Sequence, residues 1–213
     1  KRGIDACADP EVAEFNLLTV PGIYDSGITQ HMINVCEDRG DALAIIDLED
    51  DYVPFTENAS AQSARKGNVS NAVNSLRSRA INSSYGCAYY PWVQIRDPQV
   101  GSKVWVPPSV AALGTFASSE KKAELWFAPA GFNRGGLTEG AAGIPVVNTA
   151  LRLSSADRDE LYAANINPIA TFPNEGIVIF GQKTLQVTPS ALDRVNVRRL
   201  MIFVKKQISR MAA

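Results

Sequence analysis

Acidic side chains gather where an apolar run ends. Asp47, Glu49, Asp50 and Asp51 lie at or just after the run at residues 42–48. Because ligands collect at the carboxyl ends of strands in open α/β sheets, this cluster is a candidate site for a divalent metal. No second group of carboxylates with matching spacing occurs in the sequence, so a solvated loop that contacts a basic neighbour is the preferred interpretation. An α/β hydrolase or metal-dependent enzyme using Asp47, Glu49 and Asp51 stays open as an alternative.

Other residues with catalytic potential lack the neighbours that their chemistry needs. His31 is the single histidine, so a Ser-His-Asp or Cys-His mechanism would require it, yet no G-x-S-x-G elbow supplies a nucleophile. Cys36 follows it by about 1.4 helical turns and would not face it. The glycine-rich stretch 131–143 contains neither G-x-x-x-x-G-K-[ST] nor G-x-G-x-x-G. We therefore predict no catalytic, cofactor-binding or metal-binding residues, no cofactor, and no enzymatic activity.

Composition narrows the class of protein further. The 213 residues carry a net charge of −1, so no global basic field recruits nucleic acid or an anionic membrane. Three cysteines without a C-x-x-C pair argue against a disulfide framework or zinc site and favour a reducing compartment. No apolar run reaches the ~18 residues of a membrane helix. We expect a soluble, intracellular chain that begins and ends as a piece of a longer polypeptide.

Hydrophobic periodicity predicts alternating strands and helices. The predicted strands cover 15–20, 42–48, 85–95, 125–127, 169–172 and 177–180, and the predicted helices cover 26–39, 61–81, 110–118, 155–164 and 193–211. A glycine-rich loop is expected at 128–143. This order predicts an α/β (α+β) fold in which helices flank a layered sheet with right-handed crossovers.

The last predicted helix combines an apolar stripe with many cations. Its apolar residues recur at i, i+3, i+4, i+7 and i+11, which predicts the face toward the core: Val197, Leu200, Met201, Val204 and Ile208. Its cations are expected on the opposite face: Arg194, Arg198, Arg199, Lys205, Lys206 and Arg210. Such a face is either solvated or docks an acidic partner. Nucleic-acid binding through this helix stays open as a third interpretation, although the helix lacks interleaved aromatic residues.

Six stretches, in this order along the chain, resemble those of contractile-tail sheath proteins. They are EVAEFNLLTVPG at 11–22, RGDALAIID at 39–47, VPPS at 106–109, WFAPAG at 126–131, NINPIATFPNEGIVIFGQKTL at 165–185 and VNVRRL at 195–200. Phe127 replaces a more usual Lys, and a second glycine-rich turn after Ser109 is missing. We interpret these departures as changes in loops rather than in the fold.

The resemblance implies a structural subunit that polymerises helically around an inner tail tube and contracts to drive it through the host envelope. It implies a sheath core at 1–150 and the start of a C-terminal domain at 151–213. Implied partners are other copies of the chain, the tube, the baseplate and the tail terminator, with no nucleic acid or membrane. The implied location is the virion, after assembly in the host cytoplasm. A phage-derived injection system, such as an R-type pyocin, is the first alternative.

The family's C-terminal region lies toward the tube, so the resemblance makes the cationic helix the candidate tube-facing or inter-subunit surface. Only Arg198 and Arg199 belong to the matching VNVRRL motif. The family also implies extended terminal arms that add strands to neighbouring subunits.

Overall fold

The structure is a computed structural model that describes residues 1–138, 143 and 145–212. One five-stranded sheet forms its centre, with strand order β1-β2-β3-β7-β8. The strands are β1 (Leu17–Thr19), β2 (Leu43–Ile46), β3 (Gly86–Tyr90), β7 (Ile166–Phe172) and β8 (Gly176–Ile179). The first four run parallel, and β8 returns antiparallel to β7. The expected α/β architecture is confirmed.

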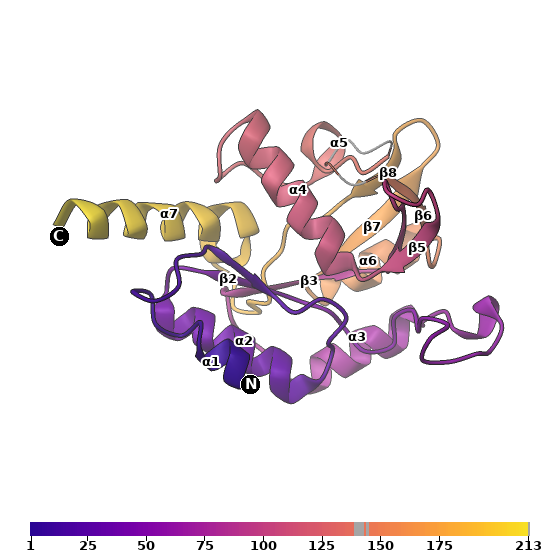
Figure 1. The fold of residues 1–213 in the computed structure, drawn as a ribbon, viewed down its shortest axis with the longest axis horizontal. Helices are drawn as coiled ribbons and strands as arrows, with labels where there is room; N and C mark the ends of the chain where they lie inside the picture. The colour runs from indigo at the N-terminus through magenta and orange to yellow at the C-terminus, as the bar shows by residue number, and fades with distance from the viewer. Residues whose placement is uncertain (139–142, 144, 213) are drawn as a thin grey trace.

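Helices cover both faces of this sheet (Figure 1). One face holds α2 (Ser26–Arg39), α3 (Val69–Ser78) and α6 (Ser155–Ala163), and the other holds α4 (Pro108–Lys122) and α7 (Val195–Ala212). A four-residue helix, α1 (Arg2–Asp5), contacts α2.

The side chains of β2 alternate between the two faces of the sheet, which explains why its sequence is apolar throughout. Ala44 and Ile46 belong to the core beneath α2, α3 and α6, whereas Leu43 and Ile45 belong to the core beneath α4 and α7. Because successive side chains of a strand point to opposite faces, a strand covered on both faces must be apolar throughout. All four residues are at most 1% exposed.

The predicted strand at 85–95 is two strands in different sheets. After β3, β4 (Val93–Arg96) pairs antiparallel with β5 (Lys103–Val106) and β6 (Val146–Thr149) in a second, three-stranded sheet. Pro91 separates them, since proline has no N–H to continue a ladder. The sequence reading missed β5 and β6.

Helix boundaries follow local capping. Asp25 caps α2, because its side chain accepts from the Ile28 N–H at 2.9 Å. Gly40 ends α2 with φ 65°. The predicted helix at 61–81 shrinks to α3, which begins at the cap Asn68, preceded by a 3-10 turn at Gln62–Ala64.

Two other expectations change. The predicted strand at 125–127 is absent, and Trp126 packs there against Phe203 of α7 with ring centroids 4.9 Å apart. The predicted glycine-rich loop contains a one-turn helix, α5 (Gly131–Arg134), and its residues 139–142 lie outside the described part of the chain.

The strands on both sides of residue 150 share the central sheet, since β7 pairs with β3. The boundary at 150 therefore does not separate two sheets, and the division into two domains stays a prediction. Within the described residues, no helix is long and apolar enough to cross a bilayer.

Candidate interaction surface at the C-terminal helix

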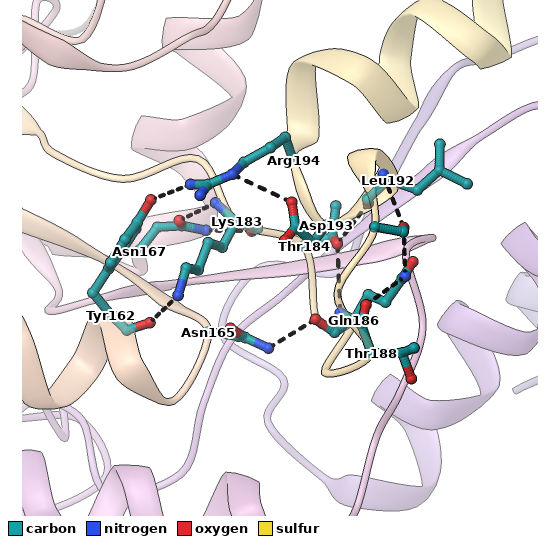
Figure 2. Close-up of polar contacts among 11 residues, drawn as sticks. Tyr162, Asn165, Asn167, Lys183, Thr184, Gln186, Thr188, Leu192, Asp193 and Arg194 are labelled. Atoms are coloured by element: carbon teal, nitrogen blue, oxygen red, sulfur yellow. Dashed lines mark hydrogen bonds and ion pairs between the residues drawn. The ribbon is translucent and has the colours of Figure 1, made fainter.

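A buried asparagine joins three segments of the chain next to α7, and Figure 2 draws it beside Lys183. Asn167, on β7, is 0% exposed. Its Nδ2 donates to the carbonyls of Ala88 (3.0 Å) and Lys183 (2.8 Å), and its Oδ1 accepts from the Lys183 N–H (2.6 Å). Asn167 therefore uses its whole amide to hold the 182–185 segment against the sheet.

That segment in turn sets where α7 begins. The Thr184 hydroxyl donates to the Leu192 carbonyl (3.0 Å), and the Thr184 N–H donates to the Asp193 carbonyl (2.9 Å). At the first residue of the helix, the Val195 N–H donates to the Gln182 carbonyl at 2.9 Å. Because the first N–H groups of a helix lack internal partners, these bonds fix the first turn of α7 on the core.

Two cations beside this joint share Tyr162 of α6 (Figure 2). Lys183 Nζ donates to the Tyr162 carbonyl at 2.9 Å and lies 4.2 Å from the centre of its ring. Arg194 Nη1 donates to the Tyr162 hydroxyl. Burial, followed by the charge of Arg194, lowers the pKa of Lys183. The cations here tie α6 to the start of α7, and Arg194 keeps a partly exposed side chain, 42%.

The predicted inward stripe of α7 is wrong, because the helix lies with its apolar stripe toward solvent. Leu200, Met201, Val204 and Ile208 are 37%, 49%, 38% and 58% exposed. The buried residues are instead Val195, Arg198, Arg199 and Ile202. The periodicity identified the helix correctly but assigned its faces the wrong way round.

Aromatic rings explain how two arginines replace aliphatic residues beneath α7. The Arg198 guanidinium lies 4.0 Å from the centre of the Tyr85 ring, and its Nε donates to the Ser84 hydroxyl at 3.0 Å. The Arg199 guanidinium lies 4.7 Å from the Phe116 ring centre. Arginine is suited to such sites because its planar, weakly hydrated cation stacks on rings.

Both arginines are therefore engaged inside the chain, at 8% and 2% exposure. Burial lowers the pKa of Arg199, an effect that the Glu120 carboxylate, 3.5 Å from Nη2, opposes. Within this chain they offer no charge to a partner, which departs from the expected role of Arg198 and Arg199.

The remaining cations tie the second half of α7 to the N-terminal region. Lys205 Nζ donates to the Arg39 carbonyl at 2.9 Å, and Lys206 Nζ donates to the Phe15 carbonyl. Arg210 pairs with Glu14. Lys205 and Arg210 are nevertheless exposed. That the six cations contact a partner stays a prediction. The better candidates for such a contact are Arg194, Lys205 and Arg210, because their side chains are more exposed than those of the other three.

Asp47, Glu49 and Asp51 of the acidic cluster have different partners. Asp47 accepts from the N–H and hydroxyl of Ser109, at 3.1 and 2.8 Å, and from the Gly22 N–H at 2.8 Å. It thereby satisfies the start of α4. Glu49 accepts from the Ser75 hydroxyl at 2.9 Å. In the described ranges 1–138, 143 and 145–212, no three acidic, histidine or cysteine side chains gather as metal ligands.

Asp51 is the most strongly perturbed of these groups. Its Oδ1 accepts from the N–H groups of Tyr52 (2.8 Å) and Trp92 (3.0 Å), while its buried Oδ2 has no partner among the described residues. Burial raises the pKa of Asp51 to about 8, and burial also raises that of Asp47. The two carboxyls hold backbone in place.

His31 and the cysteines form no catalytic arrangement. His31 Nε2 lies 2.5 Å from Asp5 Oδ1 on the surface. Cys7, Cys36 and Cys87 are free, and burial raises the pKa of Cys36 and Cys87 to about 12.

Sequence reasoning missed Asn167 and Ser84 as structural residues. A polar side chain inside the apolar run 166–170 was the one available signal for Asn167. Nothing in the sequence around Ser84 indicates that it receives Arg198 from a helix 114 residues away.

Comparisons with known proteins identify the family. The profile of the phage tail sheath protein central domain matches residues 3–185. The tail sheath protein of Salmonella phage ViI is 31% identical over 215 residues, covering 99% of this chain and 33% of that protein. The tail sheath protein of Enterobacteria phage T4 is 37% identical over 106 residues, covering 50% of this chain and 15% of that protein. The chain thus spans a third or less of these relatives.

Solved structures share the fold. The helical sheath of the anti-feeding prophage in its contracted state has a TM-score of 0.63 and 21% identity, covering 94% of this chain and 47% of that one. The contracted sheath of the extracellular injection system PVC has a TM-score of 0.62 and 21% identity, with coverage of 94% and 48%. Because the central-domain profile covers most of its 213 residues, the chain belongs to the phage tail sheath family.

Proposed function

We propose that this chain is the core of a structural subunit of a contractile phage tail sheath. In the assembled particle, copies polymerise helically around the inner tail tube and contract to drive it through the host envelope. The observation that carries the proposal is the match of residues 3–185 to the sheath central domain. The 31% identity to the ViI sheath protein along 99% of the chain supports it.

The construction of the core suits a part that moves as a rigid body. Both faces of the central sheet are covered by helices, and the Asn167 and Thr184 contacts fix α7 to that sheet. A densely packed core has low compressibility and transmits strain. Contraction would then change contacts between subunits while each core keeps its shape.

The proposed partners are other copies of the chain, the inner tube, the baseplate and the tail terminator, with no nucleic acid or membrane. The subunit acts without catalysis or a cofactor, is assembled in the host cytoplasm and is carried in the virion. Arg194, Lys205 and Arg210 are the proposed tube-facing or inter-subunit cations, supported by their partial exposure at the end of the core. Arg198 and Arg199 act instead by holding α7 in place.

A sheath of a phage-derived injection system is the second candidate, because two structures with this fold come from such systems. Both are under 25% identical and support the fold alone. The curated sequence relatives above 30% identity are phage proteins, which favours the phage assignment.

The test is negative-stain electron microscopy of the full-length protein that contains these residues, concentrated near neutral pH. Hollow tubes or stacked rings are expected. Replacing Lys205 and Arg210 by alanine tests the cation role separately: tubes should still form but should co-sediment less with the purified inner tube. Monomers under all assembly conditions would refute the sheath proposal, and unchanged tube binding would refute the role of the cations alone.

A further inference from the structure

The outward side of α7 carries a continuous apolar stripe over its last four turns. Beyond Val197, the stripe consists of Met201, Val204, Ile208 and Met211, which are 49%, 38%, 58% and 78% exposed. Scattered apolar residues on a surface need no explanation, but contiguous apolar patches mark interaction sites. In Figure 1 the C-terminal half of α7 extends to one end of the molecule, beyond the central sheet.

The spacing of this stripe indicates what covers it. From Val197 the steps are four, three, four and three residues, which is the a/d pattern of a coiled-coil seam. A seam of this kind keeps one narrow line of side chains facing a second helix for several turns. The geometric complement of the outward face is therefore another α-helix.

Charge narrows the identity of that helix. Between residues 195 and 212, α7 contains no acidic residue, and Lys205 stands directly beside the seam at Val204. Two copies of α7 would place Lys205 of each copy beside the shared seam with no acidic residue of α7 to oppose it, and like charges at such positions are unfavourable. A helix with acidic residues beside its apolar line complements α7.

An anionic membrane fits less well. Trp, Tyr and Phe are absent from the exposed stripe, although these residues mark membrane-interface helices. Lys206 and Arg210 also reach the body of this chain, at Phe15 and Glu14, rather than standing beside the stripe. A helical protein partner is the occupant that the observations favour.

The seam is already ordered before any partner arrives. Arg198, Arg199 and Ile202 anchor the opposite side of α7 in the core, and Lys205 ties it to the end of α2. Docking on a preformed helix avoids the entropic cost of forming it, which favours binding.

We propose that the outward face of α7 is a docking site for an amphipathic α-helix that carries acidic residues beside its apolar line and lies outside residues 1–212. The two helices pack as a short coiled coil through Met201, Val204, Ile208 and Met211. This site concerns the chain's own surface and does not depend on the sheath function.

The experiment titrates a fluorescently labelled synthetic peptide of about 21 residues, roughly three heptads with Leu at a and d and Glu at e and g, against the 213-residue chain. Anisotropy should show saturable binding. Met201→Glu and Ile208→Glu should each weaken it about tenfold or more, since each buries a charge in the seam. Val187→Glu, at a residue that is 68% exposed and lies off α7, is the matched control and should bind like the original chain. Circular dichroism confirms that each variant is folded.

Three results would overturn the proposal. The first is absence of binding, or binding that Met201→Glu and Ile208→Glu leave unchanged. The second is equal binding of a matched peptide with Lys in place of Glu. The third is self-association or membrane binding through the stripe. It would appear as a dimer in sedimentation equilibrium, or as binding to vesicles of anionic phospholipid, in either case abolished by Met201→Glu and Ile208→Glu but not competed by the acidic peptide.

Discussion

Replacing Asp51 by asparagine should change how the stability of the fold depends on pH. Asp51 is 6% exposed, and one of its oxygens has no partner among the described residues. Burial raises its pKa from the ordinary 3.8 to about 8, although two N–H groups that favour the carboxylate act against this rise. The folded chain therefore retains a proton on Asp51 at neutral pH that the unfolded chain has lost.

The sign and size follow from proton linkage. Between the two pKa values the unfolded state binds one proton fewer, so the free energy of unfolding falls as pH rises, by ~1.4 kcal/mol per pH unit. Asp51 alone should therefore remove about 3 kcal/mol between pH ~5 and pH ~7. Its contribution to stability is complete below the unfolded pKa and is lost as pH rises toward the folded value of about 8.

Asp51→Asn keeps an oxygen that accepts from the backbone of Tyr52 and Trp92 but cannot ionise. Its amide N–H₂ lacks an acceptor, but so does the O–H of protonated Asp51 at acidic pH, so both chains carry an unpaired buried donor there. The variant should thus be about as stable as the original near pH ~5 and more stable above pH ~7. Glu57→Gln, on the same loop and exposed, is the control for removing one carboxylate.

Urea unfolding followed by tryptophan fluorescence at several pH values measures this. The difference in free energy of unfolding between Asp51→Asn and the original chain should grow in favour of the variant as pH rises from ~5 to ~8, whereas the difference for Glu57→Gln should stay nearly constant. Parallel pH profiles for Asp51→Asn and the original chain would refute the reasoning, because they would mean that Asp51 titrates alike in both states.

Two further predictions follow from buried groups. Asn167→Ala should lower the free energy of unfolding by about 2–4 kcal/mol, because it removes three hydrogen bonds and leaves buried backbone groups unpaired, whereas Asn74→Ala on the exposed side of α3 should change it little; an equal, small loss for both in urea unfolding would contradict the role of Asn167. A thiol reagent near pH ~8 should modify Cys7 in the folded chain but Cys36 and Cys87 only after unfolding, because burial holds the pKa of both near 12. Mass spectrometry of labelled peptides distinguishes these outcomes, and rapid labelling of Cys87 in the folded chain would contradict its burial.

The central sheet was predictable because its strands are buried on both faces. The run 42–48 is apolar without interruption, and only a strand covered by helices on both sides tolerates that pattern. Strands β4, β5 and β6 are short and partly exposed, so their sequences carry weak periodicity. Their pairing across about 50 residues depends on tertiary contacts that local patterns do not encode.

Periodicity could not predict which face of α7 meets the core. It shows that the helix has an apolar face and a polar face, but it does not show which of the two is buried. Tyr85 and Phe116 decide the outcome, since their rings stabilise Arg198 and Arg199 under the helix. These contacts join residues more than 80 positions apart. The apolar stripe that usually marks the core is left on the surface for the same reason.

For the acidic cluster, the sequence predicted the position of the residues but not their partners. The sequence placed Asp47, Glu49 and Asp51 correctly at the end of β2, where ligands collect in sheets of this type. Their hydrogen bonds to Ser109, Ser75 and Trp92 depend on three other segments, which the local sequence does not reveal.

The central proposal is that this chain is the core of a subunit of a contractile tail sheath. Immunogold electron microscopy with antibodies raised against residues 1–213 tests this proposal. The sample is a preparation of tailed particles whose genome encodes the protein. Gold should decorate extended tails along their whole length and contracted tails over the shortened, widened sheath, with the exposed inner tube unlabelled. Gold confined to the capsid or the baseplate, or particles without label, would contradict the account.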